Sequence, residues 1–137
     1  MKAENMGRKK IVVEYPLSVK SPTIVWKMIS DAAGLQKWLA DRVEEEGETM
    51  TFTWGESWSG QDVKVSRLVD RAKFSHIRLR WEAEQSETEY WELRIAVSEV
   101  TGTLTLLITD FADDGDEDGL RSLWRDNLSR LHAVSGL

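Results

Sequence analysis

The residues of this sequence that could carry chemistry are few. The chain has two histidines, His76 and His132, and no cysteine, which excludes thiolate nucleophiles, disulfides and cysteine metal ligands. Neither histidine can be placed beside a serine or a carboxylate, as a catalytic dyad or triad requires. The sequence contains no glycine-rich phosphate loop and no pair of histidines at metal-binding spacing. Asp110, at the end of a predicted strand, is a candidate general base or, alternatively, a carboxylate that caps a loop.

An acidic segment from Asp113 to Asp118 invites a calcium-binding interpretation. Its carboxylates do not follow the EF-hand pattern, which needs acids at alternate positions, a glycine at the sixth and a glutamate at the twelfth. The segment precedes a predicted helix, and Arg130 and His132 lie near the end of that helix, so both sets of charges complement the helix dipole. We therefore predict no metal site and no cofactor. Glutamates within residues 44–48 are interpreted as a solvated loop and the start of a strand.

The chain holds seven tryptophans in 137 residues, an unusual number. Tryptophan is large, is usually buried, and carries an N–H that needs a partner. This number of tryptophans predicts either a hydrophobic core rich in tryptophan or a cavity lined by aromatic rings. Trp38 is a candidate for the cavity mouth, whereas the side on which Trp58 lies is ambiguous because nearby glycines allow the strand register to slip. The predicted ligand-binding residues are Trp38, Phe52, Trp54, Trp81, Trp91, Trp124 and Asn127.

Asn127 is the one polar residue predicted to lie inside an apolar helix face. At about 100° per residue it falls about 20° from Leu120 on the helical wheel, so its amide should face the sheet. An unpaired buried amide costs about 1–3 kcal/mol, so it must have a partner. A backbone carbonyl or a structural water is the simpler interpretation, and a ligand in the cavity is the alternative.

The element that must position these residues is a long helix predicted over Gly119 to Val134. Polar residues fill one side of its wheel, and the opposite arc must be buried. The residues of that apolar arc are Leu120, Leu123, Trp124, Leu128, Leu131 and Val134.

Period-two alternation dominates the chain from Ile11 to Asp110 and predicts antiparallel strands with one packed and one wet face. Connections of a few residues fit hairpins and are too short for parallel crossovers. Turns are predicted at Gly55, at residues 70–73 and at Gly102, and Val63 and Val65 are predicted to share a face. The inward rows comprise Met50, Phe52 and Trp54; Ile77, Leu79 and Trp81; Trp91, Leu93, Ile95 and Val97; and Leu104, Leu106 and Ile108.

The N-terminal part is predicted to hold one strand and two helices. Residues 11–19 alternate as a strand, and Pro16 cannot donate to a ladder, which predicts an edge position. Ser21 and Pro22 are typical of a helix start. That helix buries Ile24, Val25, Met28 and Ile29 and is predicted to end at Gly34, before a second short helix with Leu35, Trp38 and Leu39. Residues 1–9 are expected to be a flexible lead to a single domain spanning 1–137.

Charge and hydropathy exclude several classes of partner. The formal net charge is −6 and the basic residues do not cluster, so we expect no nucleic-acid partner. No apolar run approaches the roughly 20 residues that span a bilayer, and the first ten residues lack the apolar segment of a signal peptide. We therefore expect no membrane span and a cytoplasmic location.

Several short motifs carry a resemblance to a known family. They are Glu14 to Leu17 with Ser21 and Pro22, Gly34 to Asp41, Thr51 to Trp54, Ile77 to Trp81, Ile108 to Ala112, and Leu123 with Trp124. From about Lys10 onward the chain resembles bacterial START-like domain proteins, whose relatives include chaperone ATPase-activator homologues, polyketide cyclases and lipid-transfer START domains. The resemblance implies an α+β helix-grip fold: a curved antiparallel sheet of about six strands, two short helices near the N-terminus, and a long C-terminal helix across the concave face.

The resemblance also implies a cavity between the sheet and the long helix. The function we expect is non-enzymatic binding of a hydrophobic small molecule, a lipid or an aromatic compound, in this cavity. One alternative is a protein-partner module similar to the chaperone activators, using the outer sheet face around Arg78, Arg80 and Arg94. A second alternative is a cyclase or hydrolase, for which Asp110 is the candidate base. A core filled by its own side chains is also compatible with the sequence.

Overall fold

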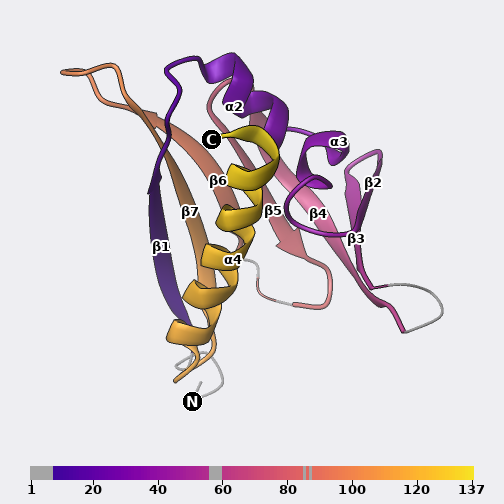
Figure 1. The fold of residues 1–137 in the computed structure, drawn as a ribbon. Helices are drawn as coiled ribbons and strands as arrows, with labels where there is room; N and C mark the ends of the chain where they lie inside the picture. The colour runs from indigo at the N-terminus through magenta and orange to yellow at the C-terminus, as the bar shows by residue number, and fades with distance from the viewer. Residues whose placement is uncertain (1–7, 56–59, 85, 87) are drawn as a thin grey trace.

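The computed structural model describes residues 8–55, 60–84, 86 and 88–137, and in them the chain forms an α+β fold with a single antiparallel sheet (Figure 1). Seven described strands follow the order β1-β7-β6-β5-β4-β3-β2. The strands are β1 (Lys9–Pro16), β2 (Arg42–Glu46), β3 (Thr49–Trp54), β4 (Asp62–Ala72), β5 (His76–Trp81), β6 (Trp91–Val97) and β7 (Leu104–Ala112), and the helices are α2 (Pro22–Ile29), α3 (Ala32–Leu35) and α4 (Glu117–Ser135).

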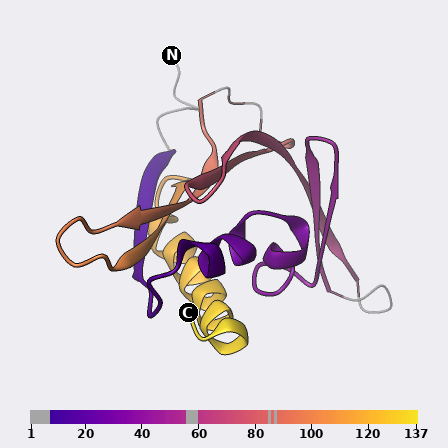
Figure 2. The same cartoon turned by 90° about the horizontal axis from the view of Figure 1, so that it is seen from above.

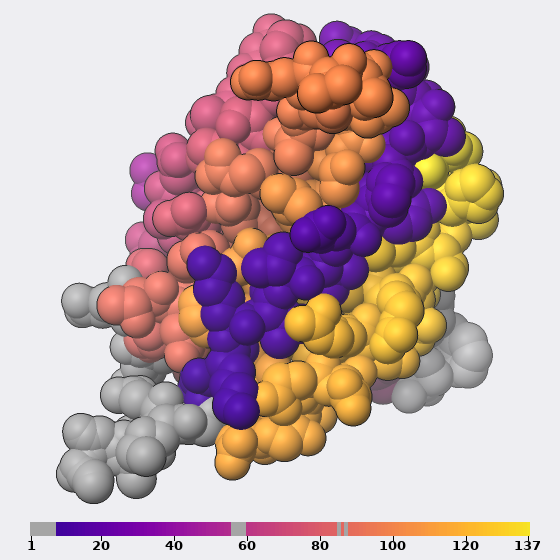
Figure 3. All heavy atoms as spheres, turned by 90° about the vertical axis from the view of Figure 1, so that its left-hand side faces the viewer, coloured from indigo at the N-terminus to yellow at the C-terminus, as the bar shows by residue number. Residues whose placement is uncertain are grey.

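The sheet curves around α4, which lies along its hollow side, while α2 and α3 lie at one end of the hollow (Figures 1 and 2). On the face shown in Figure 3, β1 runs beside α4, and the two elements are in contact. The inward rows of β5, β6 and β7 supply most of the core, and Ile77, Leu79 and Leu93 are fully buried. The helix-grip architecture predicted from the sequence is confirmed.

The sheet has one strand more than the approximate six expected within the described residues, because residues 42–46 form an edge strand of their own. Val43 anchors β2 by packing into the core, where it is 5% exposed, opposite Phe52 of β3. The glutamates of this segment alternate with it and lie largely in solvent. A period-two pattern with a single apolar residue was too weak to identify the strand.

The edge position predicted from Pro16 is confirmed. Strand β1 has one neighbour, β7, and Pro16 is the last residue of the strand, so its missing N–H breaks no interior ladder. The two residues of the expected lead that the structure describes are placed: Lys9 begins β1, and Arg8 precedes it. Residues 1–7 of that lead, and Trp58 in the segment 56–59, lie outside the described residues.

The helical pair differs from the prediction in its boundaries. Helix α2 starts at Pro22 as expected, but the Ser21 side chain makes no capping bond, Ile24 is exposed, and the helix ends at Ile29. Gly34 does not end it. Gly34 lies within α3, where a Cβ would stand 2.0 Å from the Lys27 carbonyl oxygen, so glycine is required by close helix packing. Asp31 caps α3 by accepting a hydrogen bond from the Gly34 N–H at 3.0 Å.

Helix α4 begins two residues before the predicted start and ends at Ser135, followed by Gly136 in the left-handed conformation at φ 78°. Its buried face is narrower than the predicted arc: Trp124, Asn127, Leu128 and Leu131 are buried. Leu123 and Val134 are each 54% exposed, contrary to expectation. The sheet therefore covers only the central stripe of the helix. None of the described helices combines the length and the apolar character needed to cross a bilayer.

A turn was predicted at residues 70–73, but strand β4 continues as far as Ala72. A register irregularity between Leu68 and Asp70 accommodates the extra length, and the strand pairs with β5 as far as Ala72. The chain reverses at residues 73–75, where Phe74 adopts φ 65° and its ring packs edge-on against Trp26 at 6.3 Å. Phe74 therefore holds a conformation that is rare for a bulky side chain.

Candidate functional site

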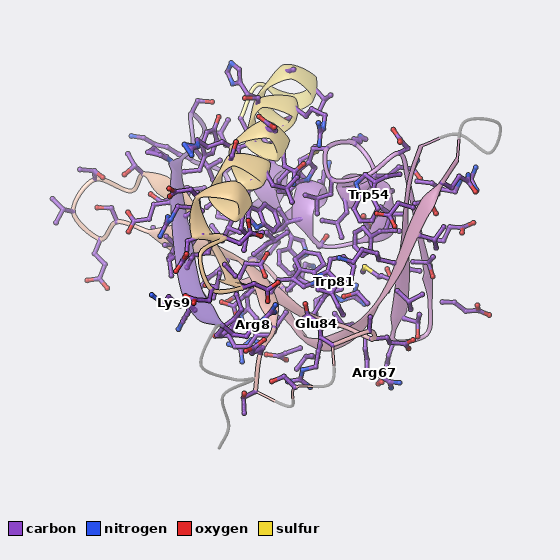
Figure 4. All side chains as sticks on the ribbon, turned by 90° about the horizontal axis from the view of Figure 1, so that it is seen from below. Arg8, Lys9, Trp54, Arg67, Trp81 and Glu84 are labelled. Carbon is purple, nitrogen blue, oxygen red and sulfur yellow. The ribbon has the colours of Figure 1, made fainter. Side chains whose placement is uncertain are left out.

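A cavity of about 130 Å³ lies between the sheet and the N-terminal half of α4. Aromatic rings form most of its wall, leucines of α4 and of the segment after α3 complete it, and three polar side chains reach it. Figure 4 shows two of these rings, Trp54 and Trp81, on the concave side of the sheet. The described lining residues are Leu39, Phe52, Trp54, Lys64, Trp81, Trp91, Asp110, Leu120, Leu123, Trp124 and Asn127.

The aromatic wall arises from the pairing of adjacent strands. Residues directly opposite one another in antiparallel strands share a face: Trp91 of β6 lies opposite Leu79 of β5, so Trp81, two residues further along β5, is on the same inward face. Phe52 of β3 reaches these rings across the intervening strand β4. Trp81 stacks on Trp91 with ring centroids 5.3 Å apart, and Phe52 meets both rings edge-on at 5.4 and 5.6 Å. Trp124 continues the row from α4, 6.2 Å from Trp91. The rings thus form one continuous surface from the sheet to the helix.

Three of the indole N–H groups in this wall are satisfied by the protein. Trp54 donates to the Leu39 carbonyl at 2.8 Å, and Trp91 donates to the Ser66 hydroxyl at 3.1 Å. Trp124 donates to the carboxylate of Asp110 at 2.9 Å. These bonds fix the ring orientations, so the wall is preorganised.

Lys64 is a cation on the concave face. It lies opposite Phe52 in the β3–β4 register and therefore shares the inward face with that ring. Its Nζ lies 4.5 Å from the centroid of the Trp81 ring, a cation–π distance. Lys64 makes no ion pair with any residue that the structure describes. The cavity thus has an accessible ammonium at its rim.

Asn127 has a different partner from the carbonyl or water that the sequence favoured. Its Oδ1 accepts a hydrogen bond from the guanidinium of Arg130, whose Nε also donates to the Trp38 carbonyl at 3.1 Å. Because arginine only donates, this contact fixes the amide orientation, with oxygen toward Arg130. The Nδ2 group makes no hydrogen bond with the described residues, and Asn127 is one of the residues that line the cavity.

Asp110 is the acidic group of the cavity. Burial raises its pKa to about 6, although hydrogen bonds from Trp124 and from the Phe111 N–H oppose the shift. The Phe111 N–H bonds to Oδ1 at 2.8 Å, and Trp124 bonds to Oδ2. Each carboxylate oxygen therefore already accepts one hydrogen bond from the protein.

The structure brings six of the seven sequence-predicted binding residues to one cavity. Trp38 is the exception: it is 1% exposed and is not one of the residues that line this cavity. Its N–H donates to the Met28 carbonyl at 2.8 Å, and its ring lies 6.5 Å from Trp124. Trp38 thus holds the helical pair against the core rather than standing at the mouth. The rim position belongs to Leu123, the exposed leucine of α4.

The sequence did not identify Lys64 as a cavity residue. Its strand alternates Val63 and Val65 with Lys64 and Ser66, and the sequence predicted only that the two valines share a face. The structure turns that face outward: Val63 is 51% exposed, whereas Ser66 is fully buried. The pairing with β3 could have shown that Lys64 faces inward. Phe52 is apolar and therefore inward, and the residue opposite it shares its face.

The outer face of the sheet, which the sequence suggested as a partner surface, satisfies its own charges. Glu92 is 5% exposed and accepts hydrogen bonds from Arg78 at 2.8 Å and from Arg94 at 2.9 Å. Burial alone would raise the pKa of Glu92, but these hydrogen bonds lower it below its ordinary value. Arg80 donates to the Glu89 carbonyl at 2.9 Å. These arginines are engaged within the fold.

A second charged cluster joins the start of β1 to two loops. Arg8 pairs with Asp113 at 2.7 Å, Glu89 at 2.9 Å and Glu84 at 3.2 Å, and Figure 4 shows Arg8 and Glu84 close together. Burial alone would lower the pKa of Arg8, but these acids raise it. The cluster links Glu84 and Glu89, which precede β6, to Asp113, which precedes α4.

Comparison with known proteins places the chain in a family. A model described as a START-like superfamily domain matches residues 5–137. Among solved structures, the chain is similar to protein BfR322 from Bacteroides fragilis, with 34% identity, a TM-score of 0.63, and coverage of 94% of this chain and 92% of that chain. No curated protein matches the chain.

Two more distant structures share the fold. The Aha1 dimer from Colwellia psychrerythraea has a TM-score of 0.69 at 12% identity, over 93% of this chain and 96% of that chain. Protein CV1439 from Chromobacterium violaceum has a TM-score of 0.69 at 18% identity, over 93% of this chain and 97% of that chain.

Proposed function

The chain belongs to the START-like superfamily, and we propose that it is a non-enzymatic binding protein that holds a hydrophobic small molecule in the cavity between its sheet and α4. The observation that carries this proposal is the aromatic-walled cavity itself. Its rings are fixed by their own hydrogen bonds, and it has a few polar groups at its edge, the usual composition of a small-molecule site.

The cavity volume limits the part of the ligand that enters. At about 130 Å³ it is close to the roughly 150 Å³ of an apolar cavity that accepts benzene. A ring of the size of a phenylalanine side chain buries about 150 Å², or about 4 kcal/mol at 25 cal/mol per Å². That free energy corresponds to a Kd of about 1 mM, so tighter binding requires polar contacts in addition.

Two experiments test the proposal. The first is native mass spectrometry of the purified protein, followed by denaturing extraction of any bound compound, and the second is a titration with a panel of ring compounds. We expect either a stoichiometric apolar compound that leaves on denaturation or saturable binding of members of the panel. The variant Leu120→Trp fills the cavity from α4 and should abolish binding. Val134→Trp, at an exposed position of the same helix, is the matched control and should bind normally. A bare protein mass combined with no saturable binding contradicts the proposal.

A second candidate function is supported by Asp110. A carboxylate with a pKa of about 6 inside an apolar cavity suits a general base, because its basicity is matched to neutral pH. The reaction class would be a cyclisation or a hydrolysis of a compact substrate. Asp110→Asn should then eliminate turnover while ring binding persists. Unchanged turnover in that variant contradicts the catalytic role.

A further inference from the structure

Two donor groups that line the cavity make no hydrogen bond or ion pair with the described residues. The Lys64 ammonium makes no ion pair with the described residues, and the Asn127 amide is oriented with its oxygen toward Arg130 and its nitrogen unpaired. The Asp110 carboxylate accepts one hydrogen bond from the protein on each oxygen, which leaves part of its accepting capacity free. A ligand that complements this arrangement brings acceptors and negative charge, because donors without acceptors lose hydrogen bonds on desolvation.

The two donors belong to opposite walls. Lys64 comes from β4 and Asn127 comes from α4, and both line the same cavity. Lys64 sits over the Trp81 ring, so its charge lies at the edge of the aromatic surface rather than in its centre. A ring lying against the aromatic wall would therefore have one donor on the sheet side and one on the helix side.

We propose that the cavity selects a compact ring compound that carries a carboxylate, with the ring inside the aromatic wall beside Trp124 and the carboxylate bound by Lys64 and Asn127. This assignment depends on the proposed function as a cavity-binding protein and adds the chemical class of the ligand. Lys64 sets the preference for the anion, and the cavity volume sets the preference for a single ring.

A matched pair of probes separates the ring from the charge. Benzoate and benzamide have nearly the same shape, but only benzoate is an anion. In titrations followed by tryptophan fluorescence, the wild type should bind benzoate about tenfold more tightly than benzamide. A charge-assisted hydrogen bond contributes a difference of that size. Added salt should weaken benzoate binding and leave benzamide binding unchanged.

Variants at Lys64 assign the preference to one residue. Lys64→Met keeps the aliphatic stem over Trp81 and should lower benzoate affinity about tenfold while leaving benzamide affinity unchanged, and Lys64→Arg should restore most of the benzoate affinity. Lys73→Met is the matched control: Lys73 also stands over a ring, 5.1 Å from the Phe74 centroid, but it does not line this cavity, and its loss should have no effect.

The outcomes that overturn this inference differ from those that overturn the proposed function. Equal binding of both probes, or benzoate binding that Lys64→Met leaves unchanged, contradicts the carboxylate class but leaves the cavity-binding function standing. Failure of both probes contradicts the single-ring carboxylate assignment, and the cavity-binding function is then decided by the extraction experiment and the Leu120→Trp variant.

Discussion

The indole N–H of Trp124 donates a hydrogen bond of 2.9 Å to the carboxylate of Asp110, which joins helix α4 to the last strand of the sheet at the wall of the cavity. One partner is a ring against which a ligand would lie, and the other is an acid whose pKa burial raises to about 6. The ionisation of Asp110 is therefore linked to the packing of the helix that closes the cavity.

Asp110 should make the stability of the fold depend on pH. Its pKa rises from an ordinary value of 3.8 to about 6 on folding, so the folded state holds the proton more tightly than the unfolded state. The favourable contribution is complete below pH 3.8 and is lost as the pH rises through 6. At about 1.4 kcal/mol per pKa unit, the loss is about 3 kcal/mol.

This prediction is checked by urea unfolding of the wild type and of Asp110→Asn between pH 3.5 and 7. That window of about 3.5 pH units includes both pKa values. The unfolding free energy of the wild type should fall relative to that of the variant across this window. Parallel curves for the two proteins would show that Asp110 titrates normally in the folded state.

Glu92 should contribute strongly at neutral pH. Glu92→Gln removes the charge that holds Arg78 and Arg94, and we expect a loss of about 2 kcal/mol in the free energy of unfolding at pH 7. Because folding lowers the pKa of Glu92, its contribution is present above the ordinary glutamate pKa and is lost as the pH falls through the lowered value. The difference in the free energy of unfolding between the wild type and Glu92→Gln should therefore become smaller at acidic pH.

The control for this prediction is Glu82→Gln. Glu82 faces Arg67 at 3.8 Å with both side chains largely in solvent, so its loss should change stability by less than about 0.5 kcal/mol. Equal effects of the two substitutions at pH 7 would mean that burial of Glu92 is energetically unimportant.

Gly34→Ala should destabilise the fold by about 3 kcal/mol. The added Cβ would stand 2.0 Å from the Lys27 carbonyl oxygen, and backbone on both sides prevents easy relaxation. Gly119→Ala is the matched control, because its Cβ meets the mobile end of the Asp116 side chain at 2.7 Å, which can rotate away. Thermal unfolding should separate the two variants clearly, and similar melting temperatures would contradict the close packing of α2 on α3.

Asn127→Leu should weaken benzoate binding about tenfold and leave the fold intact. The substitution removes the amide donor from the cavity and the acceptor from Arg130, but the added apolar burial offsets the lost hydrogen bond, so stability should change by about 1 kcal/mol or less. Ser129→Leu, on the exposed side of α4, should leave benzoate affinity unchanged. Undiminished benzoate affinity in Asn127→Leu would remove this residue from the binding site.

Sequence patterns predicted the parts of the fold in which local periodicity and burial agree. The alternation around Leu79 and Leu93 identified the inward rows of β5 and β6, and the helical spacing of Trp124 and Leu128 identified the face of α4 that meets them. The same strand rows and the same helix face also hold Trp81, Trp91 and Trp124, which line the cavity. The aromatic part of the site could therefore be predicted without knowledge of strand order.

The polar part of the site depends on register and could not be predicted in the same way. Lys64 faces inward because it lies opposite Phe52. The alternation of Val63 and Val65 within one strand does not show which of the two faces is inward. The partner of Asn127 was easier to predict from the sequence. Arg130 lies three residues further along the helix, a spacing at which side chains meet. Leu123 is exposed because the cavity rim, rather than the sheet, lies beneath it.

The most direct test of the central claim is a titration of ¹⁵N-labelled protein with benzoate, followed by NMR of the tryptophan indole N–H signals. We predict that the signals of Trp54, Trp81, Trp91 and Trp124 shift together and saturate, because these rings line the cavity. The signal of Trp26, which packs on Phe74 away from the cavity, should remain in place. Signals that do not move, or a shift confined to Trp26, would contradict the binding of a ring carboxylate in the cavity beneath α4.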